Sequence, residues 1–174
     1  MKAWKRNLLL RRQAAAWTAV AVGALWVAGC ASFGPGDIGP GSTRDALEAR
    51  LGPPHAVHDL PGRLRRLEYN TGPYGRHTWM ADVDVTGRIL ALNQVMAPAF
   101  YDRVAAGMTQ AELLRLLGRP VHRIGKWRNG QIWSWRYPGF DCLWYRVELD
   151  AASRVEGGGH APDPACDGDN DQVR

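Results

Sequence analysis

The chain has 174 residues, of which 45% are hydrophobic and 22% are charged. This size supports one folded unit with a proper core and leaves little room for two independent ones. The formal net charge is +5, but five of the 22 Lys and Arg residues precede residue 30 and no acid does, so the rest of the chain carries 17 bases and 17 acids. A neutral remainder lacks the basic surface that nucleic acids require, so we expect no nucleic-acid partner.

Residues 1–29 have the pattern of a lipoprotein signal peptide. A positively charged start is followed by an apolar run from Ala14 to Ala28, which is shorter than the roughly 20 residues of a membrane-spanning helix. The run ends in Val27-Ala28-Gly29-Cys30, which resembles the bacterial lipobox. We therefore expect lipidation of Cys30 and attachment to a membrane through its acyl chains. The alternatives are a signal-anchor helix and an ordinary secretory signal with Cys30 as a bystander.

Both ends of the remaining chain are poor in large apolar residues. Residues 30–40, rich in Gly and Pro, predict a flexible tether. Residues 158–174, rich in Gly, Pro and Asp, predict an acidic flexible tail. In an oxidising compartment Cys142 and Cys166, the thiols that remain besides Cys30, form a candidate disulfide that would join this tail to a strand.

Between these ends the sequence repeats itself at a spacing of 66 residues. The segment 41–54, GSTRDALEARLGPP, returns as GMTQAELLRLLGRP at 107–120, and Tyr69 returns as Trp135. This spacing divides the chain into repeat 1, residues 41–97, and a linking helix with repeat 2, residues 98–157. The linking helix is expected at residues 98–106.

Each repeat predicts a short helix followed by antiparallel strands. Thr43, or its neighbour Ser42, and Thr109 are suited to cap a helix, which Gly52 and Gly118 would end. Apolar and polar residues then alternate with a period of two, as in strands with one wet face. Three pairs have the composition of two-residue hairpin turns, namely Pro61-Gly62, Thr86-Gly87 and Asn129-Gly130. The predicted class is α+β, with two tandem repeats of short helices packed on an antiparallel β-meander.

The motifs resemble those of a known lipoprotein family. Gly107-Met108-Thr109, Leu117-Gly118-Arg119-Pro120 and the later Trp-Ser-Trp-Arg-Tyr run at 133–137 resemble the BamE family, also called SmpA/OmlA-like lipoproteins, with two units in tandem. The resemblance implies a fold like that of BamE and of the β-lactamase inhibitor proteins. It also implies a lipid-anchored place on the periplasmic side of the outer membrane and an accessory role in outer-membrane assembly or envelope maintenance. Ala31, where many inner-membrane lipoproteins carry Asp, favours the same membrane.

The sequence offers no grouping of residues that predicts catalysis. The histidines are scattered, and a metal site at His55 and His58 would have only Asp59 as a nearby third ligand. The acids of the tail lack the glycine turn and the terminal Glu of a calcium loop. We therefore expect no enzyme activity, no cofactor, no metal and no small-molecule substrate.

Aromatic residues crowd repeat 2 and are the candidate partner-binding residues. The candidates are Trp133, Trp135, Arg136, Tyr137 and Phe140. They could instead form the core of the sheet beneath a helix, since a strand hides only one of its faces. Exposed, they would serve a protein-interaction module that docks an envelope protein. The alternative function is an inhibitor that clasps a periplasmic enzyme through a concave sheet formed by both repeats.

Overall fold

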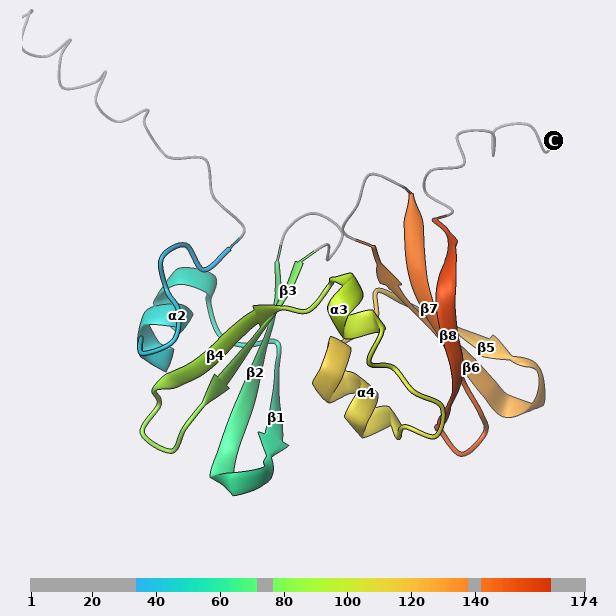
Figure 1. The fold of residues 1–174 in the computed structure, drawn as a ribbon, viewed down its shortest axis with the longest axis horizontal. Helices are drawn as coiled ribbons and strands as arrows, with labels where there is room; N and C mark the ends of the chain where they lie inside the picture. Colours follow the sequence, from blue (N-terminus) through green and yellow to red (C-terminus); the bar gives the residue numbers. More distant parts are fainter. Residues whose placement is uncertain (1–33, 72–76, 138–141, 164–174) are drawn as a thin grey trace, which may run out of the picture. The chain divides into compact units, whose positions relative to one another are not determined.

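The computed structural model describes residues 34–71, 77–137 and 142–163 (Figure 1). Within these ranges the chain forms two four-stranded antiparallel sheets, and in each sheet the strands are neighbours in sequence order. The first sheet consists of β1 (Ala56–Leu60), β2 (Leu64–Thr71), β3 (His77–Val83) and β4 (Ile89–Gln94). The second consists of β5 (His122–Lys126), β6 (Gly130–Arg136), β7 (Leu143–Leu149) and β8 (Val155–Pro162).

The helices are few and short, and this corrects the predicted fold class. The α-helices of the described ranges are α2 (Arg44–Leu51), α3 (Pro98–Tyr101) and α4 (Gln110–Leu117), with single 3-10 turns at η2 (Pro61–Arg63) and η4 (Trp127–Asn129). The predicted α+β class, with two BamE-like or β-lactamase-inhibitor-protein-like repeats of helices packed on a meander, was wrong because the described chain is mostly β. None of the helices described is long and apolar enough to cross a membrane.

Local signals explain where the two longer helices begin and end. The Thr43 side chain accepts a hydrogen bond from the Ala46 amide, and Thr109 forms a reciprocal capping box with Glu112. Both helices stop after eight residues, at Gly52 and Gly118, whose φ angles are 81° and 73°. Since positive φ is costly for other residues, glycine fixes both helix ends.

Several connections differ from their predictions, among them the turn at Pro61-Gly62, where the three residues of η2 and not two join β1 to β2. The linking helix covers only Pro98–Tyr101 rather than residues 98–106. The β5–β6 connection is not a two-residue hairpin at Asn129-Gly130, because η4 forms the turn and Gly130 already belongs to β6. Arg128 and Asn129 have positive φ in this turn. The chain therefore reverses one residue earlier than the Asn-Gly pair predicts.

The two sheets correspond in register. Leu67 on β2 lies opposite Ala81 on β3, and Trp133 on β6 lies opposite Val147 on β7. Each residue of the second pair comes 66 positions after its counterpart. The faces of the two sheets can therefore be compared position by position.

Helix α2 packs on one face of the first sheet. Its Leu47 is fully buried in a cluster with residues of β2, β3 and β4, namely Leu67, Tyr69, Ala81, Val83 and Ile89. Burying a leucine of this kind stabilises the fold by about 1.5–3 kcal/mol. Helix α2 does not cover the opposite face of the first sheet.

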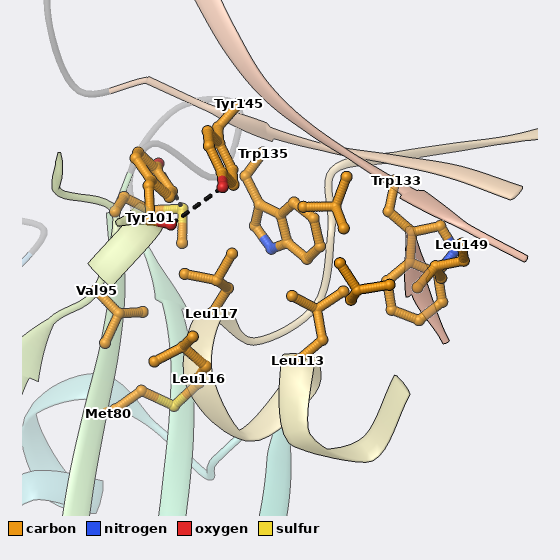
Figure 2. Packing of buried hydrophobic residues seen from close by; sticks show 13 residues of the cluster. Met80, Val95, Tyr101, Leu113, Leu116, Leu117, Trp133, Trp135, Tyr145 and Leu149 are labelled. Atoms are coloured by element: carbon orange, nitrogen blue, oxygen red, sulfur yellow. Dashed lines mark hydrogen bonds between the residues drawn. The ribbon is translucent and has the colours of Figure 1, made fainter. Parts of the chain in front are cut away.

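Helix α4 covers that opposite face and one face of the second sheet as well. Leu113, Leu116 and Leu117 are buried in one cluster with Met80 of β3 and Trp135 of β6 (Figure 2). The same cluster contains Val95, Met96, Tyr101, Trp133, Tyr145, Val147, Leu149 and Val155. Both sheets therefore share one hydrophobic core, and α4 supplies its centre.

Candidate functional site

Two residues of the first sheet, Arg66 and Glu68, hold α4 on the face that α2 does not cover. Arg66 of β2 forms a two-point ion pair with Asp82, and its third nitrogen donates to the Arg115 carbonyl in the last turn of α4 over 2.8 Å. Glu68, fully buried, accepts from the backbone amide of Arg119 over 2.8 Å. We call this surface the helix-bound face of the first sheet.

No helix of the described ranges covers the corresponding side of the second sheet. We call it the open face; strand alternation and register place on it Ile132 and Ser134 of β6 and Trp144, Arg146 and Glu148 of β7. The described helices pack elsewhere, since α2 belongs to the core of the first sheet and α3 and α4 belong to the shared core on the other side. The open face is therefore the candidate interaction surface.

Trp144 is the large aromatic residue at one end of the open face. Its ring lies 5.6 Å from the Arg136 guanidinium and 5.8 Å from that of Arg146, measured to the ring centroid, and 5.6 Å from the ring of His122. Only 7% of the residue is exposed, yet its indole N–H has no hydrogen-bond partner. A buried donor without an acceptor costs about 1–3 kcal/mol, and the indole nitrogen is itself out of contact with solvent.

Arg146 is the second unsatisfied group on the open face. Its Nε is buried without a hydrogen-bond partner, and within the described ranges it forms no ion pair. The other charges nearby are neutralised, because Lys126 contacts both Glu148 and Glu156, while Arg136 pairs with Asp163. Among the described residues, Arg146 is therefore a cation of this face that no carboxylate neutralises.

A groove of about 500 Å³ runs beside Arg146 along the edge strand β8. Its wall includes the glycine run Gly157–Gly159, and a Cβ at Gly157 or Gly159 would meet no heavy atom within 4 Å. Gly158 differs, since a Cβ there would lie 2.7 Å from the Tyr145 hydroxyl. The two outward glycines thus leave room where side chains would otherwise cover the sheet.

Exposed apolar residues follow the other edge strand, β5. Val121 is 44% exposed, Ile124 is 41% exposed, and Trp127 in the following turn is 86% exposed. Exposed apolar side chains, and exposed tryptophan above all, are typical of interaction surfaces. The sequence prediction did not include Trp127 among the partner-binding residues. Its position in a tight turn beside Arg128 was the sequence signal that its side chain is exposed.

The predicted partner-binding residues lie mainly in the core. Trp133 and Trp135 are fully buried, so the interpretation of these two rings as an exposed patch needs correction. The Trp135 indole donates to the Gly118 carbonyl, and Trp133 is covered by Arg123, whose guanidinium lies 4.2 Å from the ring centroid. β6 turns its odd-numbered side chains inward, and the strand alternation could not say which face α4 would cover.

The remaining candidates lie at the end of β6. Tyr137 is partly buried against the shared core, 5.7 Å from the ring of Tyr101, and Arg136 pairs with Asp163. Phe140 lies outside the described residues. Arg136 alone reaches the open face, through its contact with Trp144.

The remaining sequence predictions concern the cysteines and the histidines. Cys142 is disulfide-bonded. Cys30 and Cys166 both lie outside the described residues, so lipidation of Cys30 and the pairing of Cys142 with Cys166 stay predictions. His58 contacts the buried Glu68 carboxylate at 3.0 Å. Over the described ranges, no three His, Cys, Asp or Glu side chains gather as metal ligands would.

Comparisons with known proteins add no family. No family model matches the chain, and no curated protein matches it either. An extracellular protein containing an SCP domain from Bacillus anthracis str. Ames is similar over 71% of this chain and 44% of its own, at 12% identity and a TM-score of 0.28. A cysteine-rich secretory protein from Staphylococcus aureus subsp. aureus Mu50 is similar over 71% and 43%, at 10% identity and a TM-score of 0.27.

These results overturn the resemblance to the BamE family. No family model and no curated protein supports a BamE-like unit. The short Gly-Met-Thr and Leu-Gly-x-Pro motifs mark the ends of a helix, which many unrelated chains share. The chain spans less than half the length of both neighbours, whose low scores assign it neither fold nor function. In the part of the chain that the structure describes, the protein is mostly β, with two sheets and one sheet face that no helix covers.

Proposed function

We propose that this protein is a lipid-anchored interaction module of the bacterial envelope that binds a protein partner through the open face of its second sheet. One observation carries the proposal: no described helix covers the open face, which holds the groove beside Arg146, whereas the corresponding face of the first sheet is covered by α4. Anchoring rests on the lipobox ending at Cys30. Ala31 favours the periplasmic side of the outer membrane.

The specific role in outer-membrane assembly depended on the family resemblance, so the proposal does not include it. The inhibitor alternative has less support. It needs a concave surface shared by both sheets, but α4 occupies the face of the first sheet on that side and fills the core between them. Binding through one exposed face requires no such shared surface.

Photo-cross-linking in cells tests the partner surface. A benzophenone amino acid at Ile124, exposed beside the open face, should give a defined cross-linked product. The matched control is Val85, which is 75% exposed in the turn after β3, where the same probe should give none. Adding Arg146→Glu should abolish the Ile124 product. Equal products from both positions, or a product that survives Arg146→Glu, would contradict the proposal.

The anchor is tested separately by metabolic labelling with a palmitate analogue. The wild-type chain should incorporate the label, while Cys30→Ser should lose it and Cys142→Ser should keep it. Retention of label in Cys30→Ser would contradict lipid anchoring at this residue without bearing on the open face.

A further inference from the structure

We propose that one end of the first sheet, where α2 ends and β3 begins, lies against the membrane surface and faces the lipid headgroups. The inference rests on the lipid anchor of the proposed function and adds which surface of the domain meets the bilayer. Two observations carry it. The segment before α2 is packed on the domain, and its first residue lies at this end of the sheet.

Residues 34–41, which precede α2, are part of the folded domain. The Gly41 amide donates to a carbonyl of β4 over 2.8 Å, and Ile38 packs against the core cluster of the first sheet. At the start of the segment, Arg50 Nε in the last turn of α2 donates to the Gly34 carbonyl over 3.4 Å. Most of the predicted tether is therefore held on the domain.

The chain between the predicted lipidation site and this segment is short. Only residues 31–33 separate Cys30 from Gly34. Because an extended chain covers at most about 3.6 Å per residue, the four steps from Cys30 to Gly34 span no more than about 14 Å. Acyl chains on Cys30 would be buried in the bilayer, so Gly34 would lie within about that distance of its surface.

A longer connection would leave the orientation free. If all of residues 30–40 formed a tether, its root-mean-square length would be about 18 Å and its full reach about 40 Å. That reach exceeds the length of β3, which is about 23 Å for seven residues. Any surface of the domain could then meet the bilayer, whereas the short connection permits only surfaces close to Gly34.

Gly34 lies at one end of the first sheet. It accepts from Arg50 at the end of α2, and a Cβ on it would lie 3.5 Å from the ring of Trp79, near the start of β3. Helix α2 begins at the opposite end, where the Arg44 amide donates to the Gly87 carbonyl in the turn after β3 over 2.8 Å. We call the surface around Gly34 the near end and the turn after β3 the far end.

Strand β3 gives the separation between the near end and the far end. A strand rises about 3.3 Å per residue, so Val83 lies about 13 Å from Trp79, and Val85 follows in the turn beyond it. Val85 is 75% exposed. Asp37, in the tight turn that follows Gly34, is exposed as well. Positions 37 and 85 therefore report on the two ends.

The test measures the distance of each end from the lipid headgroups. A fluorescent amino acid replaces Asp37 or Val85 in the full lipidated chain, which is reconstituted into vesicles of phosphatidylethanolamine and phosphatidylglycerol. A chelating lipid loaded with Cu²⁺ carries the quencher at the headgroups and quenches only nearby fluorophores. Quenching at position 37 should exceed quenching at position 85 by about two-fold or more.

The matched control is a 12-residue Gly-Ser insertion between Ser32 and Phe33. It leaves every described residue in place and adds a root-mean-square reach of about 19 Å. In this variant the two positions should be quenched alike. Equal quenching at both positions of the chain without the insertion would overturn the inference. A preference for position 37 that survives the insertion would also overturn it, because the short connection would not be its cause.

Failure of the anchor gives a different result. If Cys30 carries no lipid, the wild-type chain takes up no palmitate label and neither position is quenched, which overturns the anchor and this inference together. If the label is taken up and both positions are quenched alike, only the surface assigned to the membrane is wrong. Neither result changes the expected cross-link at Ile124 on the second sheet.

Discussion

Glu68 and Trp135 bind the two sides of a single peptide group, the one between Gly118 and Arg119 at the end of α4, although they belong to different sheets. The Glu68 carboxylate accepts from the Arg119 amide over 2.8 Å, and the Trp135 indole donates to the Gly118 carbonyl over 3.2 Å. Both contacts are made by buried side chains. The end of one helix therefore joins the two sheets through directional bonds as well as through its leucines.

Removing the Glu68 carboxylate should be strongly destabilising. Glu68→Ala leaves the Arg119 amide, the Asn70 amide and His58 without their acceptor, which should lower the free energy of unfolding by about 3–5 kcal/mol. The matched control is Glu48→Ala, which breaks the solvent-accessible pair with Arg44 and should cost less than about 1 kcal/mol. Urea denaturation measures both. Equal losses in the two variants would contradict the role given to Glu68.

Gly118 should tolerate substitution far less than Gly52. Both have positive φ, so alanine strains each by about 1 kcal/mol. At Gly118 a Cβ would also lie 2.9 Å from the Glu68 carboxylate carbon and 3.0 Å from the Met80 methyl group, whereas at Gly52 it meets nothing within 4 Å. We expect Gly118→Ala to lower the free energy of unfolding by about 2–4 kcal/mol. Similar urea midpoints for Gly118→Ala and Gly52→Ala would show that the close approach to Glu68 is unimportant.

Tyr69 should make stability fall at alkaline pH. Burial, with Glu48 nearby, raises the pKa of Tyr69 to about 12. The folded state therefore disfavours the phenolate, so stability is fully present below pH 10 and is lost as the pH rises from 10 towards 12. Tyr69→Phe should reduce this loss, as followed by urea unfolding at several pH values. An unchanged pH dependence in this variant would assign the alkaline loss to Tyr101 and Tyr145, whose pKa values burial also raises.

The same variant should fold at neutral pH without penalty. The Tyr69 hydroxyl is buried and has no hydrogen-bond partner in the described structure. Its removal leaves nothing unpaired, so we expect Tyr69→Phe to change the free energy of unfolding by no more than about 1 kcal/mol, in the stabilising direction. A loss above that size would reveal an acceptor for the hydroxyl.

The disulfide of Cys142 should link it to Cys166. A non-reducing digest analysed by mass spectrometry should yield that linked peptide pair, and reduction should lower the free energy of unfolding by about 3 kcal/mol, as expected for a closed loop of about 24 residues. Cys142→Ser should lose this sensitivity to reduction. A Cys142–Cys30 linkage would contradict both the pairing and the lipid anchor.

Much of the local structure could be predicted from sequence, but the class of the fold could not. The two ends of α4 could be predicted from Thr109, Glu112 and Gly118, because helix capping and a positive φ depend on residues close in sequence. Such signals predict where a helix or strand ends, but they do not predict how much of the chain is helix and how much is strand. The predicted fold class was therefore wrong, and the predicted family is not supported by the comparisons. The contact between Glu68 and Arg119 joins residues 51 apart, beyond any local pattern.

The candidate site illustrates the same limit. Alternation along β6 separates Trp133 and Trp135 from Ile132 and Ser134, but it cannot show which set α4 will cover. Leu113, Leu116 and Leu117, with Leu114 beside them, give α4 more than one apolar side. This number of leucines was the sequence signal that α4 packs against two sheets. A prediction made from this signal would have placed Trp135 in the core.

The position of α4 also sets the order in which the chain can complete its folding. Residues are made from the amino terminus, so β1–β4 are available before residues 110–119 exist. Until then Met80, Val95 and Met96 face water, and Glu68 has no Arg119 amide to bind. The first sheet is therefore an unfinished surface during synthesis, exposed to proteases and to aggregation. This exposure lasts until Arg119, 36 residues after the end of β3, has been added.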